Sequence, residues 1–279
     1  MTQVPGSPLS LRRVLERLEE LWPLAGAEEW DAPGLVVGDL DSSVSHIRLV
    51  VDAVPDTVVE AAEARADLVI SHHPLLLKPV HSVAEDRYKG RVVSTLIRHN
   101  MALLAAHTNA DVVPTGTSQV LADALGLVDR DVIVPSATPG HGLGQVGVLS
   151  TPSTLYDLAT HLGGLLPHTA SGIRVSGDAN SPVTRVAVCA GAGDSLLSHP
   201  LVTSADVYIT SDLRHHPASE VQAQRAGGQG PALVDISHFA AEWMWVESAG
   251  KELHEIFPDL TISVSDLVTD PWDFVVLPG

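Results

Sequence analysis

The segment IRLVVDAVPDTVVEAAEARADLVISHH, residues 47–73, sets the expectation for the fold. An apolar run opens it at 47–53, a helical pattern with Pro55 in its first turn covers 55–65, and a second apolar run fills 67–70. Proline suits the first turn of a helix, and two apolar strands joined by a helix are typical of a parallel βαβ unit. The segment therefore predicts an α/β fold, and it ends with two adjacent histidines after a buried strand.

The alternation continues on both sides of this segment. Ser10 can cap an amphipathic helix over residues 11–22, in which apolar side chains recur at the helical period. The pattern also predicts helices at 89–100 and 117–127 and a strand at 101–108. We therefore expect a parallel sheet in the first part of the chain.

The second part of the chain repeats the first. VTRVAVCAGAG followed by ADVYITSDLRHHP parallels HIRLVVDA followed by ADLVISHHP, which indicates an internal duplication. A stretch rich in Pro and Gly at 128–145 suggests a linker. We expect a first α/β lobe at 1–127, the linker at 128–145 and a second lobe at 146–231, with the segment 232–279 packing back on the first lobe.

Composition and charge exclude several classes of protein. The 279 residues include 16 Lys and Arg against 34 Asp and Glu, which gives a formal net charge of −18. This charge repels phosphate backbones, so direct nucleic-acid binding is disfavoured. The single cysteine, Cys189, lies in an apolar run and is expected to be a buried small side chain. With no long apolar stretch that could span a membrane, we expect a cytoplasmic protein.

Two His-His pairs compete for a functional role. His72 and His73 directly follow a predicted strand, and ligands in open α/β sheets bind outside the carboxyl ends of strands. His215 and His216 lie four residues beyond their strand, where a helix can begin. Position favours the first pair, although a histidine turn without a ligand is an equally simple interpretation of the dipeptide alone.

Two further strand ends carry similar side chains. His107 and Asp111 follow the apolar run that ends at residue 106, although an aspartate after a strand is often only a turn former or helix cap. His238 and Glu242 are four residues apart on a predicted helix that Ser237 can cap, so they share one helical face. Three strand ends therefore present imidazoles and carboxylates.

These donors have a chemical meaning as a set. Imidazole and carboxylate ligands without thiolate suit Zn, Mn or Fe. His72, His73, Asp111, His238 and Glu242 together are more ligands than one catalytic ion needs. We therefore predict two divalent metal ions per chain. Glu242 is expected to bridge the ions, and His72 and His73 are each expected to bind a different ion.

The chain resembles the NIF-three-like family, also known as GTP cyclohydrolase I type 2. The motifs that carry the resemblance span nearly the whole chain: WDAPGLVVGD, SHHPLLLKPV, AAHTNADVVPTG, RVAVCAGAG, ADVYITSDLRHHPASE and LVDISHFAAEW. The resemblance implies two intertwined α/β repeats with mixed sheets, toroidal hexamers and a binuclear site. It implies the metal ligands His72, His73, Asp111, His238 and Glu242, with His107 as a neighbour.

The resemblance leaves the function open between several classes. It implies a metal-dependent hydrolase that opens the guanine imidazole ring of GTP, and a nucleotide or phosphoester is the expected substrate class. Lys78 and Arg214 are candidate phosphate contacts, although a solvated charge is the simpler interpretation of each. The alternatives are a metal-dependent regulatory or protein-interaction factor without turnover, and a protein that stores or delivers metal. One departure concerns the site: Ala32 follows Trp30-Asp31 where many members have asparagine, which removes an amide near the predicted ligands.

Overall fold

The computed structural model of the protein describes residues 8–277. The chain divides into two compact units. Unit 1 comprises Met1–Val113 and Val246–Leu267, and unit 2 comprises Pro114–Trp245 and Val268–Gly279. Because the chain leaves each unit and later returns to it, the two α/β repeats are intertwined, as expected.

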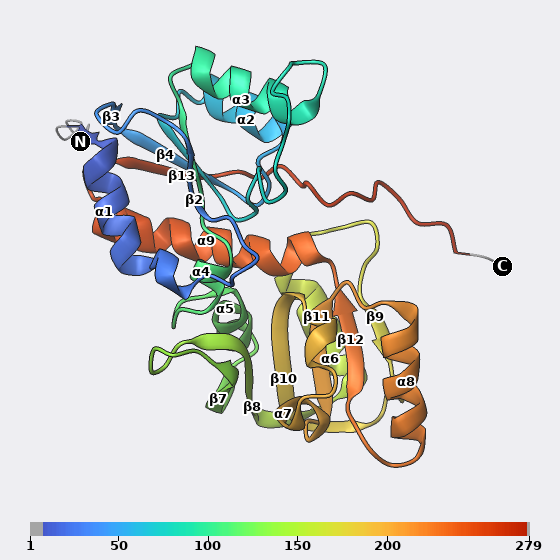
Figure 1. The fold of residues 1–279 in the computed structure, drawn as a ribbon. Helices are drawn as coiled ribbons and strands as arrows, with labels where there is room; N and C mark the ends of the chain where they lie inside the picture. The colour runs from blue at the N-terminus through green and yellow to red at the C-terminus, as the bar shows by residue number, and fades with distance from the viewer. Residues whose placement is uncertain (1–7, 278–279) are drawn as a thin grey trace. The chain divides into compact units, whose positions relative to one another are not determined.

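Unit 1 is built on a five-stranded mixed sheet (Figure 1). In the order β13-β4-β5-β6-β2, the first four strands are parallel and β2 runs antiparallel to β6. The strands are β2 (Gly34–Val37), β4 (His46–Val50), β5 (Leu68–Ser71), β6 (Ala102–Ala105) and β13 (Thr261–Val264), with a separate pair β1 (Leu9–Ser10) and β3 (Ser43–Val44). The helices are α1 (Leu11–Leu21), α2 (Pro55–Glu63), α3 (Tyr88–Arg98) and α4 (Thr108–Asp111), with a 3-10 turn at Leu24–Gly26.

Helices α1, α2 and α3 of unit 1 form where the sequence pattern predicts them. The Ser10 side chain accepts a hydrogen bond from the Arg13 N–H at 3.4 Å and so caps α1. Helices α2 and α3 lie beside each other over one face of the sheet (Figure 1), where Val58 and Leu96 join a buried apolar cluster with Val69 of β5. This packing fixes the direction of β5 and therefore the place where its carboxyl end emerges.

Unit 2 is built on a six-stranded mixed sheet in the order β7-β8-β10-β11-β12-β9. Strands β10, β11 and β12 are parallel, and β9 is antiparallel to β12. The strands are β7 (Leu127–Pro135), β8 (Gly142–Thr154), β9 (Arg174–Ser176), β10 (Pro182–Ala192), β11 (Val207–Ser211) and β12 (Ala232–Ile236). The helices are α5 (Thr117–Ala124), α6 (Leu155–Leu165), α7 (Pro200–Thr203), α8 (His215–Ala226) and α9 (His238–Ile256), with a 3-10 turn at Asp194–Leu196; α9 continues into unit 1.

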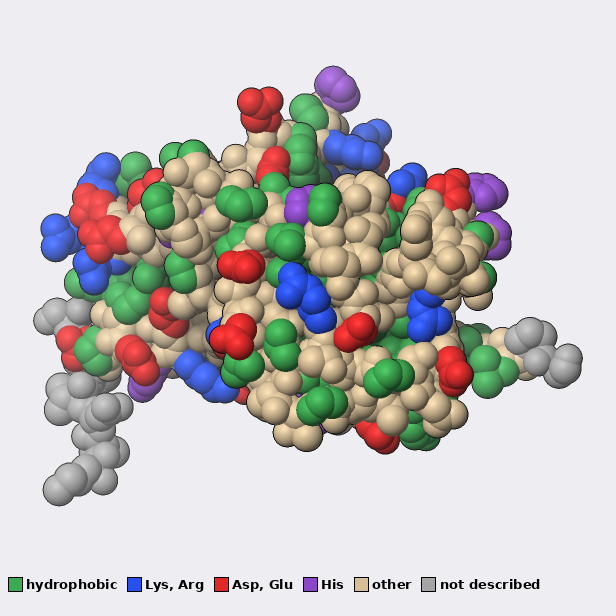
Figure 2. Space-filling view, turned by 90° about the horizontal axis from the view of Figure 1, so that it is seen from below, with side chains coloured by type: hydrophobic (Ala, Val, Ile, Leu, Met, Phe, Trp, Pro, Cys, Tyr) green, Lys and Arg blue, Asp and Glu red, His purple; other side chains and the backbone are tan. Residues whose placement is uncertain are grey.

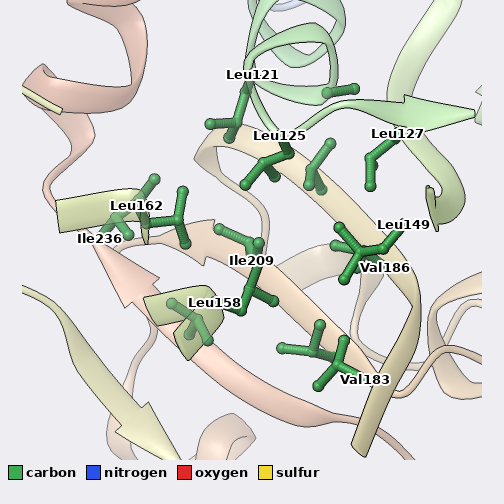
Figure 3. Packing of buried hydrophobic residues seen from close by; sticks show 14 of the residues in the cluster. Leu121, Leu125, Leu127, Leu149, Leu158, Leu162, Val183, Val186, Ile209 and Ile236 are labelled. Atoms are coloured by element: carbon green, nitrogen blue, oxygen red, sulfur yellow. The ribbon is translucent and has the colours of Figure 1, made fainter. Parts of the chain in front are cut away.

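Both faces of the unit 2 sheet are covered. On one face, Val186 and Ile209 pack with side chains of α5 and α6 such as Leu121 and Leu158 (Figure 3). On the other face, the alternate residues of β10, Ala187 and Cys189, pack in a second cluster with side chains from α7 and α8. Strands buried on both sides are apolar throughout, which explains the continuous apolar run in the sequence. Cys189 is a buried small side chain, as expected.

The duplication expected from the sequence is visible in the hydrogen bonds of the two sheets. In unit 1, the Asp67 carboxylate before β5 accepts the N–H groups of Ser45 and His46 at 2.7 and 3.0 Å. In unit 2, the Asp206 carboxylate before β11 accepts the N–H groups of Thr184 and Arg185, both at 2.8 Å. The strands β4-β5-β6-β2 of unit 1 also match β10-β11-β12-β9 of unit 2, because in each set three strands are parallel and the edge strand is antiparallel. This four-strand part has the same topology in both repeats, whereas β13, β7 and β8 lie outside it.

The linker prediction at 128–145 is wrong. These residues lie mostly in β7 and β8, which pair antiparallel as a hairpin in unit 2. The Pro and Gly content has a different cause. Pro135 ends an edge strand, where a missing N–H is tolerated, and a Cβ at Gly142 would lie 2.3 Å from the Val134 carbonyl oxygen. The division falls after Val113 instead, so α5 belongs to unit 2, and of the segment 232–279 only Val246–Leu267 joins unit 1.

Candidate metal centre

Three histidines of unit 1 converge at one edge of its sheet. His72 and His73 follow β5, and His107 follows β6 after one intervening residue. The two strands are parallel neighbours, with Ser71 paired to Ala105, so their carboxyl ends share an edge. One ring nitrogen from each histidine lies within 4.8 Å of the others. The strand-end argument named His107 beside His72 and His73, and the structure brings the three rings together.

Each of these imidazoles is held through its Nδ1 atom. The Nδ1 of His72 lies 2.9 Å from the Ala106 carbonyl oxygen, and the Nδ1 of His73 lies 2.8 Å from Asp52 Oδ1. Carbonyl and carboxylate oxygens only accept, so the proton of a neutral ring must reside on Nδ1. The Nε2 atom then carries the lone pair. Metal-binding histidines are oriented in this way.

Asp31 performs the same task for His107. Its Oδ1 lies 2.8 Å from His107 Nδ1, its Oδ2 accepts the Thr108 N–H at 3.0 Å, and its Oδ1 accepts the Ala32 N–H at 2.7 Å. Burial raises the pKa of Asp31, but the hydrogen bonds from Thr108, His107 and Ala32 outweigh it and hold the pKa below its ordinary value. The carboxylate is therefore ionised and fixes the ring. Ala32, which stands where many family members are expected to have asparagine, still donates its backbone N–H to Asp31.

His107 is kept neutral by its surroundings. Burial and then the neighbouring His72 lower its pKa, against the raising effects of Asp31 and Asp111. The exposed Trp30 ring contacts it edge-on, with ring centroids 5.9 Å apart. A neutral imidazole with a fixed tautomer has a ligand nitrogen available at neutral pH.

Asp111 completes the donors of unit 1. It is the last residue of α4, and its Oδ1 lies 3.7 Å from His72 Nε2. This distance is too long for a hydrogen bond. It is close to the roughly 3.4 Å that separates two ligand atoms bound at about 2.0–2.1 Å around one tetrahedral ion. The side chains of unit 1 therefore fit a divalent metal.

Unit 2 presents a donor pair at the start of α9. His238 Nε2 lies 2.8 Å from Glu242 Oε1, one helical turn further on, and His238 Nδ1 lies 2.7 Å from Asp212 Oδ2. The Ser237 hydroxyl accepts the Ala240 N–H at 3.2 Å and so caps the helix, as expected. With a carboxylate at each nitrogen, the ring requires a cation at one of them, either a proton or a metal. The pair therefore also fits a metal.

The backbone of β10 passes close to this pair. Gly191 has φ +78°, and a Cβ at this position would lie 2.8 Å from Glu242 Oε1 and 3.6 Å from His238 Nε2. Only glycine adopts this conformation readily and leaves the carboxylate its space. Glu242 itself is buried, which is unusual for a glutamate that serves only as a solvated helix residue.

Other predicted residues lie elsewhere. His215 and His216 begin α8 and contact each other with ring centroids 5.2 Å apart; within residues 8–277, neither joins a group of three potential metal donors. Arg214 forms an ion pair with Asp194 at 2.6 Å. Sequence reasoning missed the orienting roles of Asp52 and Asp212. Each follows a strand of its sheet closely, so the strand-end criterion applied to carboxylates could have found them.

The charged side chains of residues 8–277 do not form a surface suited to binding a polyanion such as a nucleic acid. On the face drawn in Figure 2, the Lys and Arg side chains of the described residues are scattered among acidic ones rather than gathered into a stripe. Among the same residues, no helix has the length and apolar character needed to cross a membrane.

A mixed α/β protein of two intertwined repeats, with imidazole and carboxylate donors at its strand ends, is the class that fold and site define. The chain belongs to the Duf34/NIF3 (NGG1p interacting factor 3) family, whose sequence pattern matches residues 9–271.

Relatives and solved structures agree with this membership. The chain is 45% identical to a Streptomyces coelicolor protein named GTP cyclohydrolase 1 type 2 homolog, over 94% of this chain and 93% of the relative. A Mycobacterium tuberculosis protein of the same name is 30% identical, over 94% of this chain and 96% of that protein. Among crystal structures, a Staphylococcus aureus protein superposes with a TM-score of 0.86 at 26% identity, covering 96% of this chain and 100% of that one. A Bacillus cereus protein related to NIF3 superposes with a TM-score of 0.85 at 24% identity, covering 97% of this chain and 100% of that one.

Proposed function

We propose that the protein is a metal-dependent hydrolase with a binuclear centre. Its proposed ligands are His72, His73, Asp111, His238 and Glu242, and His107 is a neighbour. The observation that carries this proposal is the common orientation of the histidines. Each predicted histidine ligand has its Nδ1 at 2.7–2.9 Å from an oxygen acceptor, which leaves Nε2 as the ligand atom.

The donor chemistry supports Zn, Mn or Fe, two ions per chain. Two such ions would lower the pKa of water and stabilise negative charge on the substrate. The residues of the chain have three tasks in this scheme. The histidines and Asp111 would hold the ions, Asp52 and Asp212 would fix the rings of His73 and His238, and Glu242 would serve as the ligand shared by both ions.

A nucleotide or phosphoester is the proposed substrate class. Two dications would offer open coordination positions to the anionic oxygens of a substrate, in a chain whose formal net charge of −18 attracts anions little elsewhere. The name of the Streptomyces coelicolor relative supports GTP as the first substrate to test. We further propose a homo-oligomer, the toroidal hexamer that the family resemblance implies, located in the cytoplasm.

A regulatory or protein-interaction factor without turnover is the second candidate, supported by the interacting-factor description of the family. Stripped protein reloaded with Zn, Mn or Fe and assayed against nucleotides and phosphoesters separates the two. Hydrolysis that requires metal and is abolished by Glu242→Gln supports the enzyme. Two bound ions without turnover on any substrate support the interaction factor. Weak, exchangeable metal on which no reaction depends indicates storage or delivery.

A further inference from the structure

The C-terminal segment carries apolar side chains that the structure leaves in solvent. Residues 272–277 read WDFVVL, five of the six being large and apolar. Trp272 is 67% exposed, Phe274 78% and Leu277 83%. Single exposed apolar residues are ordinary, but a contiguous group of this kind marks an interaction site.

This segment is extended and fixed at its start. It contains neither helix nor strand (Figure 1). Within unit 2, Asp270 Oδ1 accepts a hydrogen bond from the Ser237 hydroxyl at 2.6 Å, and Asp270 Oδ2 accepts the Trp272 N–H at 3.4 Å. In an extended chain alternate side chains share a side, so Trp272, Phe274 and Val276 would face one surface.

Unit 1 contains an apolar cavity of about 150 Å³ next to β2. Its polar lining groups are already engaged: Asn109 Nδ2 donates to the Trp22 carbonyl oxygen at 2.7 Å, and Glu19 accepts the Leu24 N–H at 3.1 Å. A cavity of this size and character accommodates a benzene ring. The remaining lining is largely leucine, from Leu15, Leu18, Leu24, Leu35 and Leu104.

The strand beside this cavity is open to further pairing. β2 is the edge strand of the five-stranded sheet and pairs with β6 on one side. Its Leu35 and the nearby Leu24 are both exposed large apolar side chains. An edge strand with an adjacent apolar pocket is the arrangement that binds an extended peptide, because the backbone pairs while alternate side chains enter the pocket.

We propose that residues 272–277 of one chain dock along β2 of a second copy, with the Phe274 ring in the cavity. A phenyl ring matches about 150 Å³ better than the larger indole of Trp272. Each copy carries both the segment and the cavity, so head-to-tail docking around a closed ring leaves neither unfilled.

The size of the contact is adequate for a specific interface. Aromatic side chains bury about 150–250 Å² each. Trp272 and Phe274 would then supply about half of the roughly 800 Å² per partner that a stable interface needs. The inference extends the homo-oligomer proposed above and does not depend on the metal centre.

Cross-linking between two differently tagged chains tests this docking. One full-length chain carries Asp273→Cys, at an exposed position that leaves the Phe274 ring intact, and the other carries Leu35→Cys. Native Cys189 is buried, so the background is low. A short bis-maleimide should join the two chains. Tyr156→Cys, at a comparably exposed aromatic on α6, should give no such product with Leu35→Cys. Light scattering of Phe274→Ser should show dissociation at about tenfold higher protein concentration or more, while Tyr156→Ser stays assembled.

Each result decides the proposal. Absence of a mixed cross-link overturns it, and a cross-link that forms only within a single chain carrying both cysteines overturns the role of a second copy. Elemental analysis of the same samples keeps the two proposals apart. Two ions per chain without a mixed cross-link removes only the docking, and a mixed cross-link with trace metal removes only the binuclear centre.

Discussion

The two units place a histidine and a carboxylate at the same point of their sheets but surround them differently. In unit 1, His107 comes two residues after β6 ends, and Asp111 follows four residues later. In unit 2, His238 comes two residues after β12 ends, and Glu242 follows four residues later. The shared topology therefore determines where these donors emerge.

The units differ at the end of the middle strand. β5 of unit 1 continues into His72 and His73, whereas β11 of unit 2 continues into Asp212, which orients His238. Unit 1 thus presents several imidazoles, and unit 2 presents one imidazole held between two carboxylates. The side chain at each strand end decides whether a repeat supplies a ligand or a group that positions one.

The largest effect is expected for Glu242→Gln. If this residue bridges two ions, the amide, a single neutral oxygen donor, should weaken both sites by at least about a hundredfold. Asp111→Asn is the matched variant in unit 1 and should weaken mainly one ion. Calorimetric metal titrations of both variants measure this contrast. Unchanged stoichiometry and affinity in Glu242→Gln would defeat the bridging assignment.

The carboxylates that hold the histidine rings allow a second comparison of the two units. Asp31→Asn and Asp212→Asn change the acceptor of a histidine Nδ1–H in unit 1 and unit 2, and Asp212→Asn should lower metal affinity about 10–100-fold. Asp31→Asn should lower the free energy of unfolding by about 2 kcal/mol, and more than Asp212→Asn, because the hydrogen-bonded carboxylate of Asp31 is fully buried whereas that of Asp212 is 60% exposed.

Denaturant unfolding of the two metal-free variants measures this difference. Equal midpoints for Asp31→Asn and Asp212→Asn would contradict it.

Gly191→Ala tests the close approach of the backbone in unit 2. The substitution should cost about 1–3 kcal/mol of stability and weaken metal binding, because the methyl group meets Glu242 at a positive φ. Gly126→Ala is the control: its φ is +66°, with nothing within 4 Å of the added Cβ, so it should cost about 1 kcal/mol and spare the metal. Metal affinity that falls equally in both would show that the effect is general strain.

The smallest effect is expected for the double variant His215→Ala, His216→Ala. Both residues lie in the first turn of α8, away from the strand ends that carry the proposed ligands. Metal content measured by elemental analysis should stay at that of the unchanged protein. Loss of one ion would show that the ligand assignment chose the wrong His-His pair.

Elements defined by local patterns could be predicted from the sequence. α2 begins at Pro55 and α9 follows the Ser237 cap, because capping and periodicity act within a few residues. The hairpin of β7 and β8 could not be predicted, because Pro and Gly mark turns, edges and close approaches alike. The hairpin is held in the sheet by the pairing of β8 with β10, which is distant in sequence.

The sequence by itself determined the α/β alternation, the duplication and the histidines that emerge at strand ends, since apolar runs and the residues that follow them are local features. Only the tertiary structure decided how those histidines are held. Asp31 lies 76 positions from His107, and Asp212 lies 26 from His238. Such contacts form only when packing sets distant strand ends side by side, and a hydrogen bond depends on that placement to within a few tenths of an ångström.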